Sequence, residues 1–105
     1  MTNELKLASS VSPTVNGNVS VGYLTMPTNT AYTQSSGTLT VSNDLVLSGA
    51  LSLASGTSMV FNGNGSHLSG TGGTFTTASG GSFPITNNKV IDAGTTITVG
   101  TSGTN

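Results

Sequence analysis

The residues that could carry acid–base chemistry are few, because the chain of 105 residues has one histidine and three carboxylates. The histidine is His67, in the stretch GNGSHLSG, and the carboxylates are Glu4, Asp44 and Asp92. A histidine acts as a general base when a carboxylate orients it and a nucleophile lies within hydrogen-bond reach. Ser66 is adjacent in sequence, and Asp44 or Asp92 could orient the ring. Such trios arise by chance in a serine-rich chain, so we expect His67 to be a solvent-facing loop residue.

The carboxylates do not predict a metal site. Calcium loops place several carboxylates close together, whereas these acids have no such spacing. Asp44 in SND and Asp92 in IDAG are typical of turn acids that hydrogen-bond their own backbone. The absence of cysteine from the sequence excludes disulfides and thiolate metal ligands. We therefore predict no catalytic residue, no metal and no cofactor, and we expect the protein not to be an enzyme.

The charge balance disfavours nucleic acid and membrane surfaces as partners. Only 5% of the residues are charged, and the net charge is −1. Binding to a phosphate backbone or an anionic lipid surface requires clustered basic residues. The basic residues here are Lys6 and Lys89, far apart in sequence, and there is no arginine. No apolar run approaches the length of a membrane-spanning helix.

The segment 37–61 has the period of two that is typical of β-strands. Apolar residues occupy odd positions, with Thr, Ser, Asp and Ala mostly between them. The eight residues concerned are Leu39, Val41, Leu45, Leu47, Leu51, Leu53, Met59 and Phe61. Strong helix formers are scarce and glycine is frequent, so we predict an all-β protein.

Two repeats overlie this alternation. The segment divides into the hexads LTVSND, LVLSGA and LSLASG, in which small or turn-prone residues close each unit and predict a corner. Gly-Thr pairs begin expected strands at Gly37, Gly56, Gly73 and Gly94. A spacing near twenty residues is about one coil of a β-solenoid, so four coils could stack. We predict a β-solenoid-like fold, with a β-sandwich or prism as the alternative.

The first third of the chain gives a different expectation. Asn16-Gly17 lies between valine-rich runs and is typical of a type I′ hairpin turn. After Leu24 the alternation fades, and Pro27 cannot donate to a ladder, which indicates an extended arm. We therefore divide the chain into an N-terminal hairpin and arm at 1–36 and a β-repeat domain at 37–105.

Threonine-containing stretches such as TLT, TFTT and TTIT could bind ice or sugar if they formed a flat array. We interpret them as strand-forming residues that keep the chain soluble without charge. Strand edges that carry few charges pair with other molecules unless something covers them. Domains of this size are also marginal in the apolar surface they bury. We therefore predict homo-oligomerisation, expected as a trimer, with the eight alternating residues of 39–61 at the contact.

The stretch LTVSNDLVLSGALSLASG, with its Gly-Thr strand starts, resembles the repetitive β-structure of bacteriophage virion proteins, such as tail fibres, spikes and head decoration proteins. It is also similar to the β-helical passenger segments of bacterial autotransporter adhesins. The first resemblance implies a non-enzymatic virion protein, made in a host cytoplasm, that decorates or cements a capsid or forms a short fibre. Its partners would be further copies and a major capsid or other virion protein. The alternative is a secreted adhesin or filament subunit at the cell surface, assembled by strand exchange.

Overall fold

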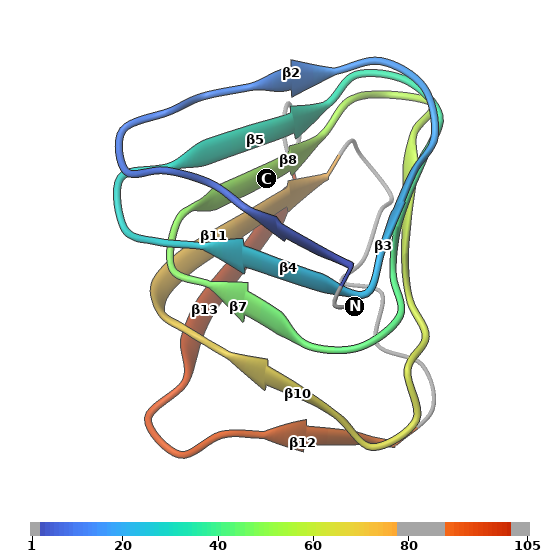
Figure 1. The fold of residues 1–105 in the computed structure, drawn as a ribbon. Coiled ribbons are helices and arrows are strands. Elements are labelled where there is room, and N and C mark those ends of the chain that lie inside the picture. Colours follow the sequence, from blue (N-terminus) through green and yellow to red (C-terminus); the bar gives the residue numbers. More distant parts are fainter. Residues whose placement is uncertain (1–2, 78–87, 102–105) are drawn as a thin grey trace.

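The structure, a computed structural model, describes residues 3–77 and 88–101. Those residues contain thirteen strands and no helix. The strands form three sheets around one core, and the chain winds through them as a β-solenoid of about four turns (Figure 1). All ten strand pairings in the described residues are parallel. The predicted all-β solenoid is therefore confirmed, and the antiparallel sandwich is not formed.

Each turn contributes strands to the sheets in a fixed order. Sheet A contains β1 (Glu4–Lys6), β4 (Tyr23–Met26), β7 (Leu45–Leu47), β10 (Ser66–Ser69) and β12 (Lys89–Ile91). Sheet B contains β2 (Thr14–Val15), β5 (Ala31–Gln34), β8 (Ala50–Leu53), β11 (Thr71–Thr77) and β13 (Thr96–Thr101). Sheet C contains β3 (Val19–Val21), β6 (Thr38–Val41) and β9 (Ser58–Phe61).

The hexads of the central segment correspond to single strands on three different faces. LTVSND contains most of β6 in sheet C, LVLSGA contains β7 in sheet A, and LSLASG contains most of β8 in sheet B. Small and polar residues close each hexad because the chain bends there from one sheet to the next. Three hexads therefore make approximately one turn of the solenoid.

Register stacks like residues on like residues along the solenoid. In sheet A, Leu24 aligns with Leu45, and Leu45 aligns with Leu68. These three leucines are between 0% and 4% exposed. Leu5 and Ile91 extend the same column at its two ends. The column, which we call the leucine ladder (Leu5, Leu24, Leu45, Leu68 and Ile91), forms one side of the core.

The interior also holds polar groups, and each has a partner. Gln34 is fully buried, and its amide donates to the carbonyls of Gly17 at 2.5 Å and Ser36 at 2.7 Å. The hydroxyl of Tyr32 donates to the amide oxygen of Gln34 at 2.7 Å. In the described residues, no buried side-chain nitrogen or oxygen lacks a hydrogen-bond partner. A buried polar group costs little when it is paired in this way.

The eight alternating residues of 39–61 lie inside the solenoid and not on its surface. Their exposed fractions run from 0% to 7%, because their own chain covers them with the turns before and after. The contact that we predicted on Leu39, Val41, Leu45, Leu47, Leu51, Leu53, Met59 and Phe61 is therefore corrected to a core.

The hairpin predicted at Asn16-Gly17 is wrong. The strands on either side, β2 and β3, belong to different sheets and pair in parallel with β5 and β6. A type I′ turn needs positive φ at both central residues, and here only Gly17 of the pair has it, at 95°. The segment expected as an arm contains β4 and β5, which pair with strands on both sides.

Candidate functional site: the charged face of sheet A

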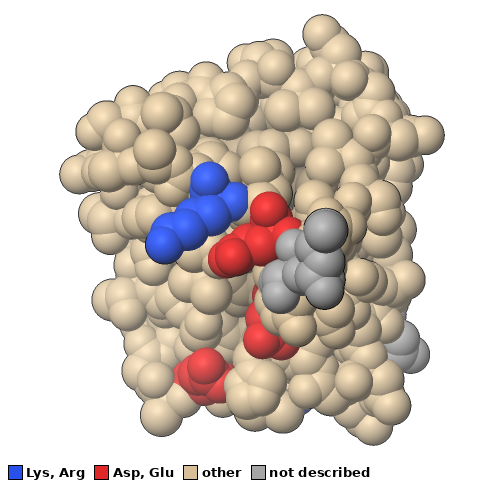
Figure 2. Space-filling view, in the orientation of Figure 1, with Lys and Arg blue, Asp and Glu red and all other residues tan. Residues whose placement is uncertain are grey.

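Most of the charged side chains, together with the histidine, gather on one of the three faces. Figure 2 shows acidic and basic side chains together on the side of the molecule formed by sheet A. Glu4, Lys6, His67 and Lys89 belong to strands of this sheet, Asp44 precedes β7, and Asp92 follows β12. These six are all the Asp, Glu, Lys and His residues of the sequence. In the described residues, the strands of sheets B and C present only uncharged side chains.

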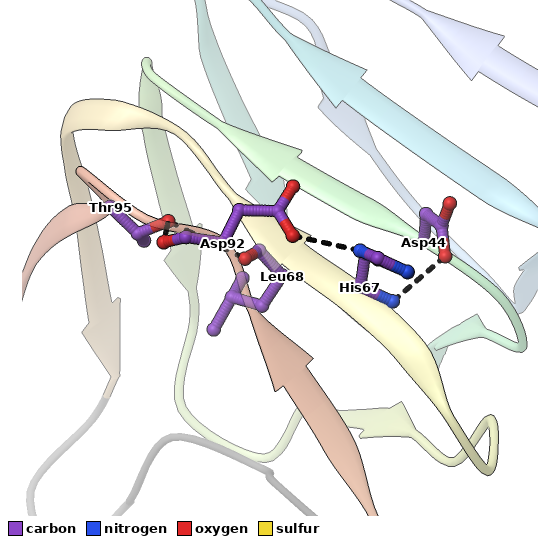
Figure 3. Close-up of polar contacts among 5 residues, drawn as sticks. All are labelled: Asp44, His67, Leu68, Asp92 and Thr95. Atoms are coloured by element: carbon purple, nitrogen blue, oxygen red, sulfur yellow. Dashed lines mark hydrogen bonds and ion pairs between the residues drawn. The ribbon is translucent and has the colours of Figure 1, made fainter.

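The closest cluster on this face joins three turns of the solenoid at His67. The Nδ1 atom of His67 lies 2.7 Å from Oδ1 of Asp92 on the following turn (Figure 3). The backbone N–H of His67 donates to Oδ1 of Asp44, on the preceding turn, at 2.8 Å. The side chains of His67 and Asp92 are 50% and 44% exposed.

Asp92 is held at the start of a turn. Its N–H donates to the carbonyl of Leu68 at 3.0 Å, and its carbonyl accepts from the Oγ1 of Thr95 at 2.7 Å (Figure 3). These backbone bonds fix the residue while its carboxylate stays available to His67.

The pKa of His67 is raised above its ordinary value. The hydrogen bond to Asp92 is the main cause, and the negative charges of Asp92 and Asp44 act in the same direction. Partial loss of solvent opposes this effect. The two carboxylates of the cluster therefore favour the protonated, imidazolium form of His67.

The arrangement does not form a nucleophilic triad. Successive side chains of a strand point to opposite faces, so Ser66 points inward while His67 points outward. Ser66 is 6% exposed, and its hydroxyl donates to the carbonyl of Gly63 at 3.2 Å. In the described residues, no group of three His, Cys, Asp or Glu side chains could hold a metal ion. The cluster offers an ion pair between His67 and Asp92, which forms when His67 is protonated and therefore depends on pH.

The structure corrects two expectations at this site. His67 is solvent-facing as expected, but it lies on strand β10 and not in a loop. The carboxylates of Asp44 and Asp92 reach neighbouring turns, whereas we predicted that they would bond their own local backbone. These contacts are not visible in the sequence, because His67 and Asp92 are 25 residues apart and one turn of the solenoid brings them together.

Lys89 faces the other way from the cluster. Its ammonium donates to the carbonyl of Gly63 and lies 4.7 Å from the ring centroid of Phe61, in a cation–π contact. Lys89 therefore packs over the end of the core near sheet C.

The threonine-containing stretches do not form one array. TLT belongs to β6 in sheet C, whereas TFTT belongs to β11 in sheet B and TTIT, apart from Thr95, belongs to β13 in the same sheet. On sheet B, Thr74 aligns with Ala50, and Ala50 aligns with Ala31, so alanine interrupts the threonine row. The interpretation as strand-forming solubility residues stays a prediction.

In the described part of the chain, no helix has the length and hydropathy required to span a bilayer. Comparison of the chain with protein-family models, with curated proteins and with solved structures found no match.

Proposed function

We propose that this chain is a non-enzymatic structural subunit of a bacteriophage particle, which decorates or cements the capsid or forms a short fibre. The observation that carries this proposal is the composition of the last turn. Val90, Ile91 and Val99 are 44%, 52% and 50% exposed, and all three lie on β12 or β13. Apolar side chains of this size, gathered beside open strand edges, are typical of surfaces that another protein covers.

The rest of the solenoid wall suits a structural role. In the described residues the buried polar groups of this parallel coil are paired, which suits a stiff support, and the outward-facing side chains of β5, β6 and β8 are Thr, Ser and Ala. The charged face of sheet A adds a polar surface that can select a partner by charge. These features support assembly into a larger particle, with the last turn as the apolar contact.

The experiment is to locate the chain in purified particles. We expect the chain to remain with phage particles through a density gradient, at a fixed ratio to the major capsid protein. Labelled chain should then be visible on the capsid or on a fibre by electron cryomicroscopy. A double variant, Val90→Lys with Val99→Lys, should lose this association, because lysines on an edge oppose pairing. Ser52→Lys is the matched control, since Ser52 lies on the outward side of β8, the central strand of sheet B, two strands from either edge.

A second candidate is a secreted adhesin or filament subunit. The observation that favours it is the parallel coil, since autotransporter passenger segments, which the sequence resembles, form parallel β-helices. In that case the chain would be found on the cell surface or in the medium and not in particles. That outcome would contradict the virion proposal and support the second candidate.

A further inference from the structure

The two ends of the described solenoid have complementary strand edges. At one end, β1 and β2 are the outermost strands of sheets A and B. At the other end, β12 and β13 are the outermost strands of the same two sheets. All of these strands run in parallel with their neighbours, so the two edges could continue one another without reversal of the chain.

The backbone groups at the two edges are in matching positions. The N–H of Asp92 donates to Leu68 O at 3.0 Å, and successive residues of a parallel strand bond to opposite sides. Ile91 therefore directs its N–H and C=O away from β10, toward the open edge. At the first turn, the carbonyl of Asn3 and the N–H of Leu7 bond to the β4 side. By the same alternation, β1 directs the groups of Glu4 and Lys6 toward its open edge.

The inward side chains would continue across such a junction. Ile91 is 52% exposed at one end of the leucine ladder, and Leu5 is partly buried at the other. If the open edge of β12 met that of β1, Ile91 would cover Leu5 as Leu45 covers Leu24. On sheet B, the column of Tyr32, Leu51, Phe75 and Val99 behaves in the same way. Its last member, Val99, is half exposed.

The outward side chains add complementary charge. Lys6 aligns with Thr25, Thr25 with Val46, and Val46 with Ser69. Asp92 follows Ile91 and so continues this column beside Ser69. One outer column of sheet A thus carries an ammonium at its first position and a carboxylate at its last. A junction of the two ends would bring Asp92 of one copy beside Lys6 of the next.

We propose that a second copy of this chain docks end to end, with the last turn of one copy on the first turn of the next. This inference rests on the proposed role as a structural subunit and names the partner of the apolar last turn. The register, the leucine ladder and the pair of Lys6 with Asp92 favour a second copy over an unrelated protein. A junction between two different surfaces does not close after two copies, so the product is an open linear fibre.

The test is the size distribution of the purified 105-residue chain as a function of concentration. Analytical ultracentrifugation at pH 8 and low salt should show a series of species that lengthens as concentration rises, without a preferred number. Electron microscopy should show unbranched rods. Ile91→Lys should weaken association by more than about tenfold, because it places a charge in the apolar junction. The matched control, Ser52→Lys on the central strand β8, should associate as the wild type does.

A charge exchange tests the junction independently of the ladder. Lys6→Asp and Asp92→Lys should each weaken association by about tenfold, because each places like charges together. The double variant restores opposite charges and should recover most of the association. Thermal unfolding of dilute samples checks that each variant is folded. If Ile91→Lys does not fold, the charge exchange alone tests the end-to-end junction.

Three results would overturn the proposal: a monomer at every concentration, a closed trimer that Ile91→Lys leaves intact, or a double charge variant no better than the single ones. Failure here is distinguishable from failure of the proposed function. A chain that is present in particles but monomeric in solution refutes the end-to-end contact only. A chain that forms rods but is absent from particles refutes the virion role only.

Discussion

His67 lies between two carboxylates that come from the turns before and after its own strand. Asp44 accepts from its backbone, and Asp92 contacts its ring. The ring contact makes the charge of His67 depend on a residue of the last turn. The cluster therefore reports on whether that turn is in place.

The first prediction concerns the pKa of His67. Asp92→Asn should lower it, because the substitution replaces the charged acceptor of the hydrogen bond that is the main cause of the raised value with a neutral amide. NMR titration measures this directly, since His67 is the single histidine of the sequence. Asp44→Asn is the matched control and should lower the pKa less, because Asp44 acts only through its charge. Equal effects from both variants would contradict the ring contact.

The second prediction is the pH dependence of stability. A folded-state pKa above the unfolded value means that the native state binds the proton more tightly. The stabilisation from His67 is complete below the ordinary pKa of about 6.5 and is lost as pH rises through the folded value. Urea unfolding should show a free energy of unfolding that decreases from pH 6 to pH 8. His67→Gln should flatten this dependence, and an unchanged slope in that variant would assign it to other groups.

At the scale of elements, local patterns predict strands well and their partners poorly. The odd-position apolar residues of 39–61 are all buried, and each hexad supplies a strand. Asn16-Gly17 misleads because a turn signal does not say whether the chain reverses within a sheet or bends into the next one. The Gly-Thr pairs recur at about the length of one coil, but they do not occupy the same position in each coil. Gly37 precedes a strand of sheet C, whereas Gly73 lies within β11 of sheet B.

The candidate site was predictable in its residues and not in its geometry. His67, Asp44 and Asp92 stand out because the chain has few ionisable groups. Their proximity depends on turn length, which changes along the solenoid. Register partners are separated by 19 residues at Glu4 and Tyr23 but by 23 at Ser66 and Lys89. No local pattern carries that difference.

The third prediction uses two glycines of neighbouring strands. A Cβ at Gly73 would lie 2.1 Å from the carbonyl oxygen of Leu47, whereas a Cβ at Gly100 would meet no atom within 4 Å. Neither glycine has positive φ, so the comparison isolates space. Gly73→Ala should destabilise the fold by about 1–3 kcal/mol, the usual cost of overpacking. Gly100→Ala should be neutral or slightly stabilising, as judged by thermal and urea unfolding, and an equal loss in both variants would refute the steric explanation.

Considered as a whole molecule, the solenoid is a stack in which each turn contacts mainly the turns beside it. Stability then varies along the axis, because an end turn has one neighbour and a central turn has two. The described end turns also carry the most exposed apolar side chains. Opening should therefore begin at the ends.

The fourth prediction follows for hydrogen exchange. In dilute monomer, amides of β6, β7 and β8 should exchange most slowly, and those of β1, β12 and β13 most rapidly. Raising the concentration should protect the end strands if copies associate there. Mass spectrometry of exchanged fragments measures both effects. Uniform exchange along the chain would show instead that the turns open together.

The in-register parallel stacking has a consequence for how such a chain could change over time. Each turn adds one inter-strand spacing, about 4.8 Å, to the axis, whatever its outer residues are. Duplication or deletion of one whole turn would alter the reach of the molecule by that increment and leave the cross-section unchanged. The length of such a molecule can therefore evolve in steps of one turn, without any redesign of its core.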